Sequence, residues 1–540
     1  MQLSLLVRRG RGPLFNSMIV MSGYVLSRIT GLGRDVVIAR HFGTSADLGA
    51  YYAAFRVTDL LYMVIIGGAL GSSFIPVFIQ VWQRDGVERA WHLASAVVSW
   101  ALLLLALAST VLWLLAPALT ARIFGGTATD VALTAHIIRL FLLSPLLLGL
   151  GGLAMAALNA QDRFTLPALA PAVYNLGIIG GAVLLAPQWG VWGLSWGVII
   201  GAALYLLIQL PGLWRMGMRL QVTFGRQLME LKTIAQQMTP RVFGQAASQI
   251  SLLITAALTT RLALGFEQLA GLNYAYQLML LPYGVFALSL STVAFPRLAR
   301  LIAEGQHTEL HASVRRTLAI ILCLTLPATA GLLILNIPLV RLLFQRGEFD
   351  QVSLAHTVAP MLGYATALPA FAASEILIRT FYAMQKTWPP VLIGLFQVAL
   401  NLSIGTLALM LGGDVSMLTL AFSFANNVEV LLLFILLGRQ QPGIWHDRPL
   451  WHSIRAALLA TGVVALFWYG MKYYSLAWLP FLALTGQYVW QRDSILLLLW
   501  LVVVGGAGCV LYMLVAAAFG MHEAQELWAR LRRYLSRASH

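Results

Sequence analysis

Charged residues and glycines alternate near the middle of the first long apolar segment of the chain. Arg28, Arg34 and Asp35 lie there, with Gly31 and Gly33 between them. Because a charge at the centre of a bilayer costs about 2.5–3.5 kcal/mol, such side chains normally face a water-filled cavity or a partner. Residues 28, 31 and 35 share one face of a helix, and glycines favour a bend or a break there. The pattern predicts a cavity for an anionic substrate; the alternative is arginines that reach the membrane interface or pair with Asp35 for folding alone.

Two further pairs of charged residues lie in apolar segments at helical spacing. Arg56 and Asp59 are three residues apart, a spacing that allows them to pair on one helix face. Glu375 and Arg379 are four apart with the acid first, which is the favourable order for an ion pair on a helix. We interpret Glu375 and Arg379 either as a structural ion pair or as groups that couple transport to an ion. Arg56 is a second-rank candidate for contact with an anionic substrate.

Two single charges complete the set of candidate site residues. Arg241 follows Pro240, where the missing backbone hydrogen bond favours polar groups that point inward. Arg241 is therefore, like Arg56, a second-rank candidate for contact with the substrate. Glu429 lies beside Asn426 and Asn427, and it either exchanges a proton or an ion or makes an interhelical hydrogen bond.

Signals for nucleotide and metal binding are weak. None of the three lysines of the chain follows a glycine, so the sequence contains no P-loop. His307 and His311 have the spacing of two metal ligands on a helix, but without a third clear ligand we expect them to be solvated. We therefore expect a protein that is not an enzyme, binds no metal or cofactor and is driven by the membrane potential or by an ion gradient.

The composition places the chain among polytopic membrane proteins. Its 540 residues are 59% hydrophobic and only 10% charged, a balance that soluble domains do not show. The net charge of +15 does not indicate nucleic-acid binding, because the basic residues lie in short segments between apolar ones. Short basic segments between apolar ones are typical of membrane proteins, where they determine the orientation of the chain in the bilayer.

Apolar segments long enough to cross about 30 Å of hydrocarbon occur about fourteen times. An even number places both termini on one side, and arginines near both ends place that side in the cytoplasm. Alternate loops agree, because the loops at 187–190 and 412–414 are poor in cations while those on the other side carry arginines. The expected spans lie near residues 13–42, 46–82, 90–118, 129–159, 165–186, 189–214, 231–262, 266–301, 313–343, 352–384, 388–412, 415–438, 453–475 and 493–520.

The first twelve spans repeat a pattern of six. Asp130 and Asp350 each precede an Ala-His pair by five residues, and Pro76 and Pro296 are separated by the same offset of 220 residues. Such parallel repeats hold a substrate between two lobes and expose it alternately to the two sides. We predict an all-α membrane protein with two pseudo-symmetric six-helix lobes and two additional helices. The predicted parts are the lobes at 13–220 and 227–440, the additional helices at 451–520 and a basic cytoplasmic tail at 521–540.

Four segments resemble the MurJ (MviN) family of lipid II flippases, which belongs with the MATE antiporters to the MOP superfamily. The sequence SRITGLGRDVVIARHFG at residues 27–43 resembles the first-helix motif of that family. Residues 237–253, 273–299 and 379–390 resemble later segments of the family in the same order. The resemblance extends over essentially all of the expected helices.

The resemblance implies a cationic central cavity and a groove for a polyprenyl tail formed by the last two helices. Arg28, Arg34 and Asp35 match the charged first-helix positions of the family, and arginine suits a diphosphate because it can bind it in bidentate fashion. Other positions that are usually charged in the family carry neutral residues here, which makes the cavity less polar. They are Gly49, Tyr62, Tyr276 and Gln277.

We therefore expect a flippase that moves lipid II, an undecaprenyl-diphosphate-linked peptidoglycan precursor, across the bacterial inner membrane. It would carry the precursor from the cytoplasmic to the outer face by alternating access. Two alternatives are a flippase for another polyprenyl-diphosphate-linked oligosaccharide and a MATE-like antiporter of drugs or cations. The expected partners are the lipid-linked anionic precursor and membrane lipids; other proteins of cell-wall synthesis are further candidates, and nucleic acid is not expected.

Overall fold

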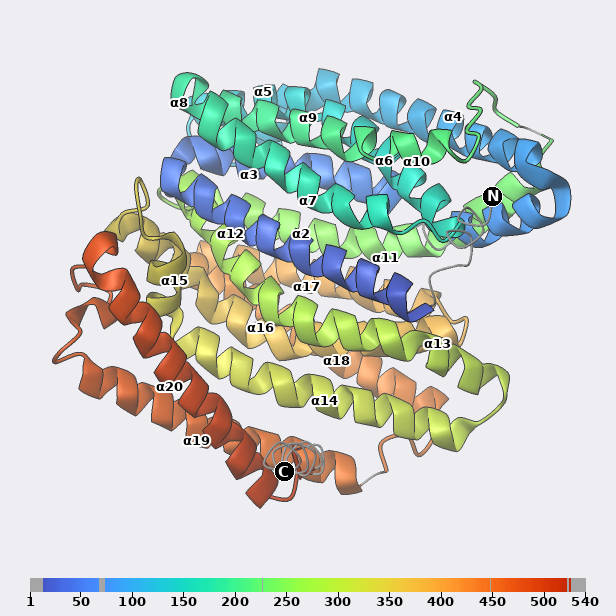
Figure 1. Ribbon diagram of the computed structural model, residues 1–540. Helices are drawn as coiled ribbons and strands as arrows, with labels where there is room; N and C mark the ends of the chain where they lie inside the picture. The colour runs from blue at the N-terminus through green and yellow to red at the C-terminus, as the bar shows by residue number, and fades with distance from the viewer. Residues whose placement is uncertain (1–12, 68–72, 226, 447, 522–523, 526–540) are drawn as a thin grey trace, which may run out of the picture. The chain divides into compact units, whose positions relative to one another are not determined.

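The fold consists of helices and connecting loops throughout the part of the chain that the structure describes. The computed structural model describes residues 13–67, 73–225, 227–446, 448–521 and 524–525, without the side chains of residues 13–17, 67, 237, 239–241 and 243 (Figure 1). Within these ranges, twelve helices are long and apolar enough to cross a membrane. The expected all-α membrane fold is confirmed, whereas the expected count of fourteen spans is not.

Two expected spans fall outside the set of twelve, and they correspond to helices α2 and α11. Helix α2 (Pro13–Phe42) carries Arg28, Arg34 and Asp35, so it is less apolar than its neighbours. Helix α11 (Met229–Thr259) includes positions whose side chains are not described. Both helices are long enough to span a bilayer of about 30 Å.

The chain divides into two compact units, which we describe separately. Unit 1 comprises Met1–Phe42 and Ala46–Leu253, and unit 2 comprises Gly43–Ser45 and Ile254–His540. The division falls inside α11, later than the expected boundary at residues 220–227. The reason is that Leu228 and Ile234 are buried in the hydrophobic core of unit 1. The limits predicted for the lobes and the tail stay a prediction.

Unit 1 is built from helices that pack around small residues. Helix α2 packs against α7, α3 against α5, and α7 against α9. The first part of α11 completes the unit. Its elements are α2, α3 (Ala46–Tyr62), the π-helix η1 (Met63–Gly67), α4 (Ile75–Ile123), α5 (Ala128–Phe141), α6 (Leu143–Ala160), α7 (Thr165–Gly180), the π-helix η3 (Gly181–Leu185), α8 (Ala186–Trp189), α9 (Val191–Leu207) and α10 (Leu210–Trp214).

Local sequence signals explain where several of these helices begin and turn. Thr127 and Asp130 form a reciprocal capping box at the start of α5, which satisfies backbone N–H groups that a helix start leaves unpaired. Within α4, Gly86 has φ 85° and ψ 177°, a conformation that glycine adopts without steric cost. The chain turns there, between the expected spans at 46–82 and 90–118.

Glycines allow α7 and α9 to approach closely, and the two helices run side by side in Figure 1. A Cβ atom at Gly177 would lie 2.3 Å from the Cα atom of Gly201. Ser195, the centre of a Gly-x-Ser-x-Gly sequence in α9, is fully buried and donates a hydrogen bond to the carbonyl oxygen of Val191 at 2.8 Å. This serine is therefore part of the helix contact and is not an exposed nucleophile.

We predict that Gly177→Ala destabilises the protein by about 1–3 kcal/mol, because the added methyl group has no space at the α7–α9 contact. The matched control is Gly180→Ala in the same helix, where a Cβ would meet nothing within 4 Å. The control should be neutral or stabilising by up to about 1 kcal/mol, because alanine favours the helix more than glycine. Thermal unfolding of the purified proteins in detergent measures both effects, and equal stability of the two variants would contradict the packing argument.

Unit 2 is organised around the long helix α16 (Gln351–Ala383), which packs against α12, α14 and α18. Its core contains large buried side chains from α14, α16 and α18, such as Leu318, Phe381 and Leu437. The other elements are the end of α11, α12 (Gly265–Pro282), the π-helix η4 (Tyr283–Leu288), α13 (Ser289–Ala303), α14 (His307–Ile334), α15 (Asn336–Phe344), α17 (Trp388–Met410), α18 (Val415–Gln440), α19 (Arg448–Ser475), the 3-10 helix η5 (Pro480–Leu482) and α20 (Trp490–Ala518).

The two units share a local feature at the offset seen in the sequence. The π-helix η1 begins at Met63 directly after α3, and the π-helix η4 begins at Tyr283 directly after α12, 220 residues later. Short π-helical insertions of this kind are rare and occur often at functional sites. Their recurrence at this offset agrees with an internal repeat.

The additional helices α19 and α20 form a hairpin that packs on α14 and shares a hydrophobic core with it (Figure 1). At the hairpin loop, Arg341 of α15 is fully buried and donates hydrogen bonds to the carbonyl oxygens of Leu484 at 3.2 Å and Gly486 at 2.7 Å. Burial lowers the pKa of the Arg341 guanidinium to about 10, which leaves it charged at neutral pH. Arg341 therefore joins the hairpin loop to the rest of unit 2.

Candidate functional site

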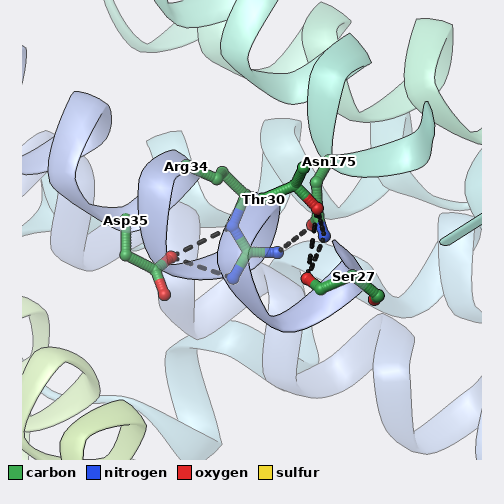
Figure 2. Close-up of polar contacts among 5 residues, drawn as sticks. All are labelled: Ser27, Thr30, Arg34, Asp35 and Asn175. Carbon is green, nitrogen blue, oxygen red and sulfur yellow. Dashed lines mark hydrogen bonds and ion pairs between the residues drawn. The ribbon is translucent and has the colours of Figure 1, made fainter. Parts of the chain in front are cut away.

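The charged cluster of unit 1 centres on Arg34, which lies in the middle part of α2 (Figure 2). Its guanidinium donates two hydrogen bonds to Oδ1 of Asp35, from Nε at 3.0 Å and from Nη2 at 2.9 Å. The Arg34 side chain is 18% exposed and that of Asp35 is 4% exposed. In an apolar environment this pairing offsets much of the cost of removing two charges from water.

Asn175 of α7 connects the cluster to a second helix. Its Oδ1 accepts a hydrogen bond from Nη1 of Arg34 at 3.1 Å, across 141 positions of sequence. Its Nδ2 lies within hydrogen-bond distance of the carbonyl oxygen of Ser27 at 3.2 Å and of Oγ1 of Thr30 at 3.3 Å. Figure 2 shows these contacts converging on one turn of α2. Asn175 therefore fixes both the guanidinium and the helix that carries it.

Glycine makes room for this contact between α2 and α7. A Cβ at Gly23 would lie 2.5 Å from the Cβ of Ala168, so the two helices touch closely at that point. A Cβ at Gly31 would lie 3.5 Å from Nδ2 of Asn175, an ordinary contact distance, while at Gly33 it would meet nothing within 4 Å. Helix α2 is continuous from Pro13 to Phe42, so the break that we expected at these glycines is absent.

Helix α3 brings a second charged pair towards the same cluster. Asp59 interacts electrostatically with both Arg56 and Arg34, which places the two predicted pairs in one region of unit 1. Three tyrosines, Tyr51, Tyr52 and Tyr174, also lie within electrostatic range of Arg34. Three of the candidate site residues, Arg34, Asp35 and Arg56, thus lie in one charged and aromatic cluster, and their role in binding a substrate stays a prediction.

Arg28 and Arg241 are placed differently. Arg28 lies two turns before Arg34 on α2; its Nη2 donates to the hydroxyl of Tyr24 at 3.0 Å, and its guanidinium lies 5.2 Å from the centre of that ring. The Tyr24 contact belongs to the same helix and leaves Arg28 partly exposed. Arg241 lies on α11, and its side chain is outside the described residues.

The predicted ion pair of unit 2 is present. Arg379 donates to Oε1 of Glu375 from Nε at 2.8 Å, and its Nη2 lies 2.7 Å from the same oxygen. Tyr283, the first residue of η4, donates its hydroxyl hydrogen to Oε2 of Glu375 at 2.8 Å. The pair therefore also ties α16 to the π-helix. Whether it serves coupling or structure stays a prediction.

The remaining candidates of unit 2 lie apart from that pair. Glu429 is partly buried on α18, and its proposed role in proton or ion exchange stays a prediction. His307 Nδ1 and His311 Nε2 lie 3.3 Å and 3.2 Å from the same atom, Oε1 of Gln441. Among the described residues no group of three potential metal ligands occurs.

Asn175 is a residue of this cluster to which the sequence analysis assigned no role. Asn401 of α17 lies 226 residues later in the chain, and both asparagine side chains are buried. Asn401 donates a hydrogen bond to Oγ1 of Thr255 at 3.2 Å. A buried amide in an apolar helix needs a hydrogen-bond partner. An asparagine in an apolar segment of each half of the chain was therefore the signal from which a contact between helices could have been predicted.

The arrangement around Arg34 is suited to binding an anion. Arginine has five N–H groups in a planar fork, and the contacts with Asp35 and Asn175 use three of them. The guanidinium is held in position while part of it stays accessible. A fixed, partly exposed guanidinium in an apolar surrounding favours oxyanions that can accept two hydrogen bonds side by side, such as carboxylates and phosphates.

The fold is that of a multi-pass, all-α membrane protein, with twelve helices among the described residues that are long and apolar enough to cross a bilayer. A solved structure titled lipid II flippase MurJ in an inward closed conformation superposes with a TM-score of 0.72 at 21% identity, covering 93% of this chain and 98% of that one. An inward-facing MATE multidrug transporter of the MOP superfamily gives a TM-score of 0.65 at 13% identity, covering 80% and 99%. These likenesses concern the fold.

Sequence comparison then identifies the family. The profile of the family described as lipid II flippase MurJ matches residues 38–488. The lipid II flippase MurJ of Burkholderia cenocepacia is 30% identical over 484 residues, which cover 85% of this chain and 92% of the relative. A probable lipid II flippase MurJ of Rhizobium tropici is 27% identical over 94% of this chain and 96% of its own length. The chain belongs to the MurJ family.

We predict that Asn175→Leu impairs transport more than it impairs folding. The substitution removes the acceptor for Arg34 and the amide that contacts α2, and the loss of such buried hydrogen bonds costs about 1–3 kcal/mol. Transport should fall further, because the guanidinium loses the group that positions it. Complementation of a strain depleted of its own flippase, normalised to protein level, measures the effect.

The matched control for this prediction is Asn401→Leu in unit 2. It removes a buried interhelical hydrogen bond of the same kind without touching Arg34. It should reduce stability by a similar amount and leave transport per folded molecule near the wild-type value. An equal loss of normalised transport in both variants would show that Asn175 acts only through stability.

Proposed function

We propose that this protein transports lipid II from the cytoplasmic to the outer face of a bacterial inner membrane by alternating access. The observation that carries the proposal is the guanidinium of Arg34, positioned by Asp35 and Asn175 inside an apolar segment. Membership of the MurJ family, whose described activity is lipid II flipping, supports this choice of substrate over other lipid-linked glycans. The reaction moves the molecule without forming or breaking a covalent bond.

The diphosphate of the substrate is the group that Arg34 would recognise. Its negative charge makes spontaneous passage through hydrocarbon very unfavourable, since an isolated ion pays a large desolvation cost. A fixed guanidinium offsets part of this cost with charge-assisted hydrogen bonds. Arg28 and Arg56 would add positive charge near the same group, while Asp35 and Asp59 keep the empty cluster close to neutral. Arg241 is a further candidate contact.

The long apolar tail would stay in contact with lipid and with the α19–α20 hairpin. Many side chains of this hairpin are exposed and apolar, including Leu466 at 74% and Val503 at 65%. A tail gains little by leaving lipid for a protein surface of similar polarity. The hairpin therefore orients the tail while the charged cluster supplies the recognition of the head group.

The energy source in this proposal is the membrane potential or an ion gradient. Moving one elementary charge across 100 mV is worth about 2.3 kcal/mol, enough to bias the exchange between two conformations. Glu429 and the Glu375–Arg379 pair, which lie in unit 2, are the candidate groups for such coupling.

We predict that Arg34→Ala abolishes transport, while Arg34→Lys retains only a part of it. Lysine keeps the charge but cannot reproduce the bidentate geometry. Arg28→Ala and Arg28→Lys should be damaging for the same reasons. Complementation together with a lipid II translocation assay in proteoliposomes measures these effects, with an expected loss of about tenfold or more for each alanine variant.

The control for these variants is Arg219→Ala in the same unit. Arg219 is 73% exposed and pairs with Glu88, itself 86% exposed, and exposed pairs contribute at most about 1 kcal/mol. This variant should transport normally. Full complementation by Arg34→Ala at wild-type protein level would refute the proposed role of that residue.

The orientation, with both termini in the cytoplasm, is part of the same proposal. It predicts that a cysteine at position 188 reacts with a membrane-impermeant maleimide in intact spheroplasts, whereas a cysteine at position 306 reacts only after lysis. Gln188 in the short helix α8 and Gln306 directly before α14 are both exposed, so Gln188→Cys and Gln306→Cys form a matched pair. The background carries Cys323→Ser and Cys509→Ser. The reversed labelling pattern would overturn the orientation.

A further inference from the structure

A large cavity lies in unit 2, at the end where α14 and α19 begin and α20 ends. Its volume is about 1250 Å³, and four arginines line it: Arg315 and Arg316 of α14, and Arg448 and Arg455 of α19. Pockets for small ligands typically measure about 300–1000 Å³, so the space is sufficient for a lipid head group. None of the residues of the Arg34 cluster takes part in it.

The spacing of the lining residues shows that two helix faces form the cavity. On α19, Arg448, His452 and Arg455 all line it, at intervals of four and three residues that place them on one face. On α14, the arginines stand between Ala312 and Ala319, which also line the cavity. The small alanine side chains leave space between the helices, while the arginines surround it with charge.

The electrostatic character of the cavity is strongly positive. Among the described lining residues there is no aspartate or glutamate; Asp447, next to Arg448 in sequence, lies outside the described residues. Arg448 and Arg455 are exposed. Clustered guanidinium groups in a hollow surface attract anions and bind phosphate with particular strength.

The rim and the adjoining surface indicate that the anion belongs to a lipid. Trp445 and Trp451 line the cavity; Trp445 stacks on Phe434 with ring centres 3.8 Å apart. Tryptophans are enriched where a membrane protein meets the head-group region. One turn further along α19, Leu458 is 52% exposed and Leu459 is 53% exposed. An apolar surface for hydrocarbon chains therefore continues from the cationic cavity.

We propose that this cavity binds the phosphate-bearing head group of a membrane lipid, whose hydrocarbon chains lie along α19. The choice of the cytoplasmic leaflet rests on the orientation proposed above, because α14 and α19 begin on the side of the termini. The lipid is either a phospholipid of that leaflet or a polyprenyl diphosphate such as the substrate carries. Both lipids would be recognised by their phosphate groups. The cavity shares no lining residue with the Arg34 cluster.

The test is equilibrium binding to the purified full-length protein in a neutral detergent. The probes are dioctanoyl phosphatidic acid, dioctanoyl glycerol without phosphate, farnesyl diphosphate and inorganic phosphate. Wild-type protein should bind the first and third and should bind dioctanoyl glycerol and inorganic phosphate much more weakly. Arg448→Gln combined with Arg455→Gln should weaken phosphatidic acid binding by at least about tenfold, because two charge-assisted contacts are lost.

The matched control combines Arg297→Gln with Arg300→Gln. Both arginines are exposed near the end of α13, and neither lines the cavity. This control should bind all four probes as the wild type does, and thermal unfolding verifies that both double variants are folded. Arg34→Ala should lower only the part of farnesyl diphosphate binding that belongs to the Arg34 cluster and should leave phosphatidic acid binding unchanged, so that failure of the transport proposal and failure of this one give different results.

Each outcome bears on the proposal. A selective loss of phosphatidic acid binding supports a phospholipid site, and a parallel loss of farnesyl diphosphate binding supports a site that also receives prenyl diphosphates. Unchanged binding of phosphatidic acid in the cavity variant would overturn the proposal. Equal affinity for dioctanoyl glycerol would overturn it in favour of apolar contact alone, and equal affinity for inorganic phosphate would overturn it in favour of a free anion.

Discussion

The charge of Arg34 in an apolar helix is the constraint on which the organisation of unit 1 depends. An isolated guanidinium in hydrocarbon is unfavourable by several kcal/mol, so the helix requires partners close by. Asp35 supplies the opposite charge at 2.9 Å, and Asn175 supplies a neutral acceptor from a different helix. Because Asn175 also contacts the backbone of α2, the same residue that satisfies the charge docks the helix. Binding chemistry and helix packing therefore use one set of contacts.

Much of this was predictable from the sequence, because membrane insertion makes charge patterns informative. The grouping of Arg34 with Asp35 and the ion pair of Glu375 with Arg379 follow from spacing on one helix, and the structure contains both pairs. Asn175 was not assigned because its contact crosses 141 positions, and periodicity carries no information about partners on other helices. The continuity of α2 through its glycines was also missed. Propensity favours a bend or a break there, but α2 packs against α7 and continues as one helix through these glycines.

The two units share local features and carry different chemistry on them. Both have a π-helix at the same offset and a buried asparagine that joins two helices. In unit 1 the asparagine binds a guanidinium, whereas in unit 2 it binds the hydroxyl of Thr255. A hydroxyl carries no charge, so the second contact stabilises helix packing alone. Unit 2 has an ion pair at another place, between Glu375 and Arg379, where the hydroxyl of Tyr283 in the π-helix donates a hydrogen bond to Glu375. The two units therefore share features of the scaffold and differ in the charged residues on it.

The α19–α20 hairpin shows where recognition of a lipid has to reside. Its inner face packs on α14 through small and buried residues such as Ala457 and Ala460, so it is integral to unit 2. Its outer face is apolar, and contact between a hydrocarbon chain and such a face gains little over contact with neighbouring lipid. Any selectivity of the hairpin for one lipid over another must therefore come from polar groups at its two ends. At one end Nη2 of Arg341 donates hydrogen bonds to two backbone carbonyl oxygens of the hairpin loop, which makes it a structural anchor. At the other end Arg448 and Arg455 line an open cavity, and this is the end at which a charged lipid head group can be distinguished from its uncharged counterpart.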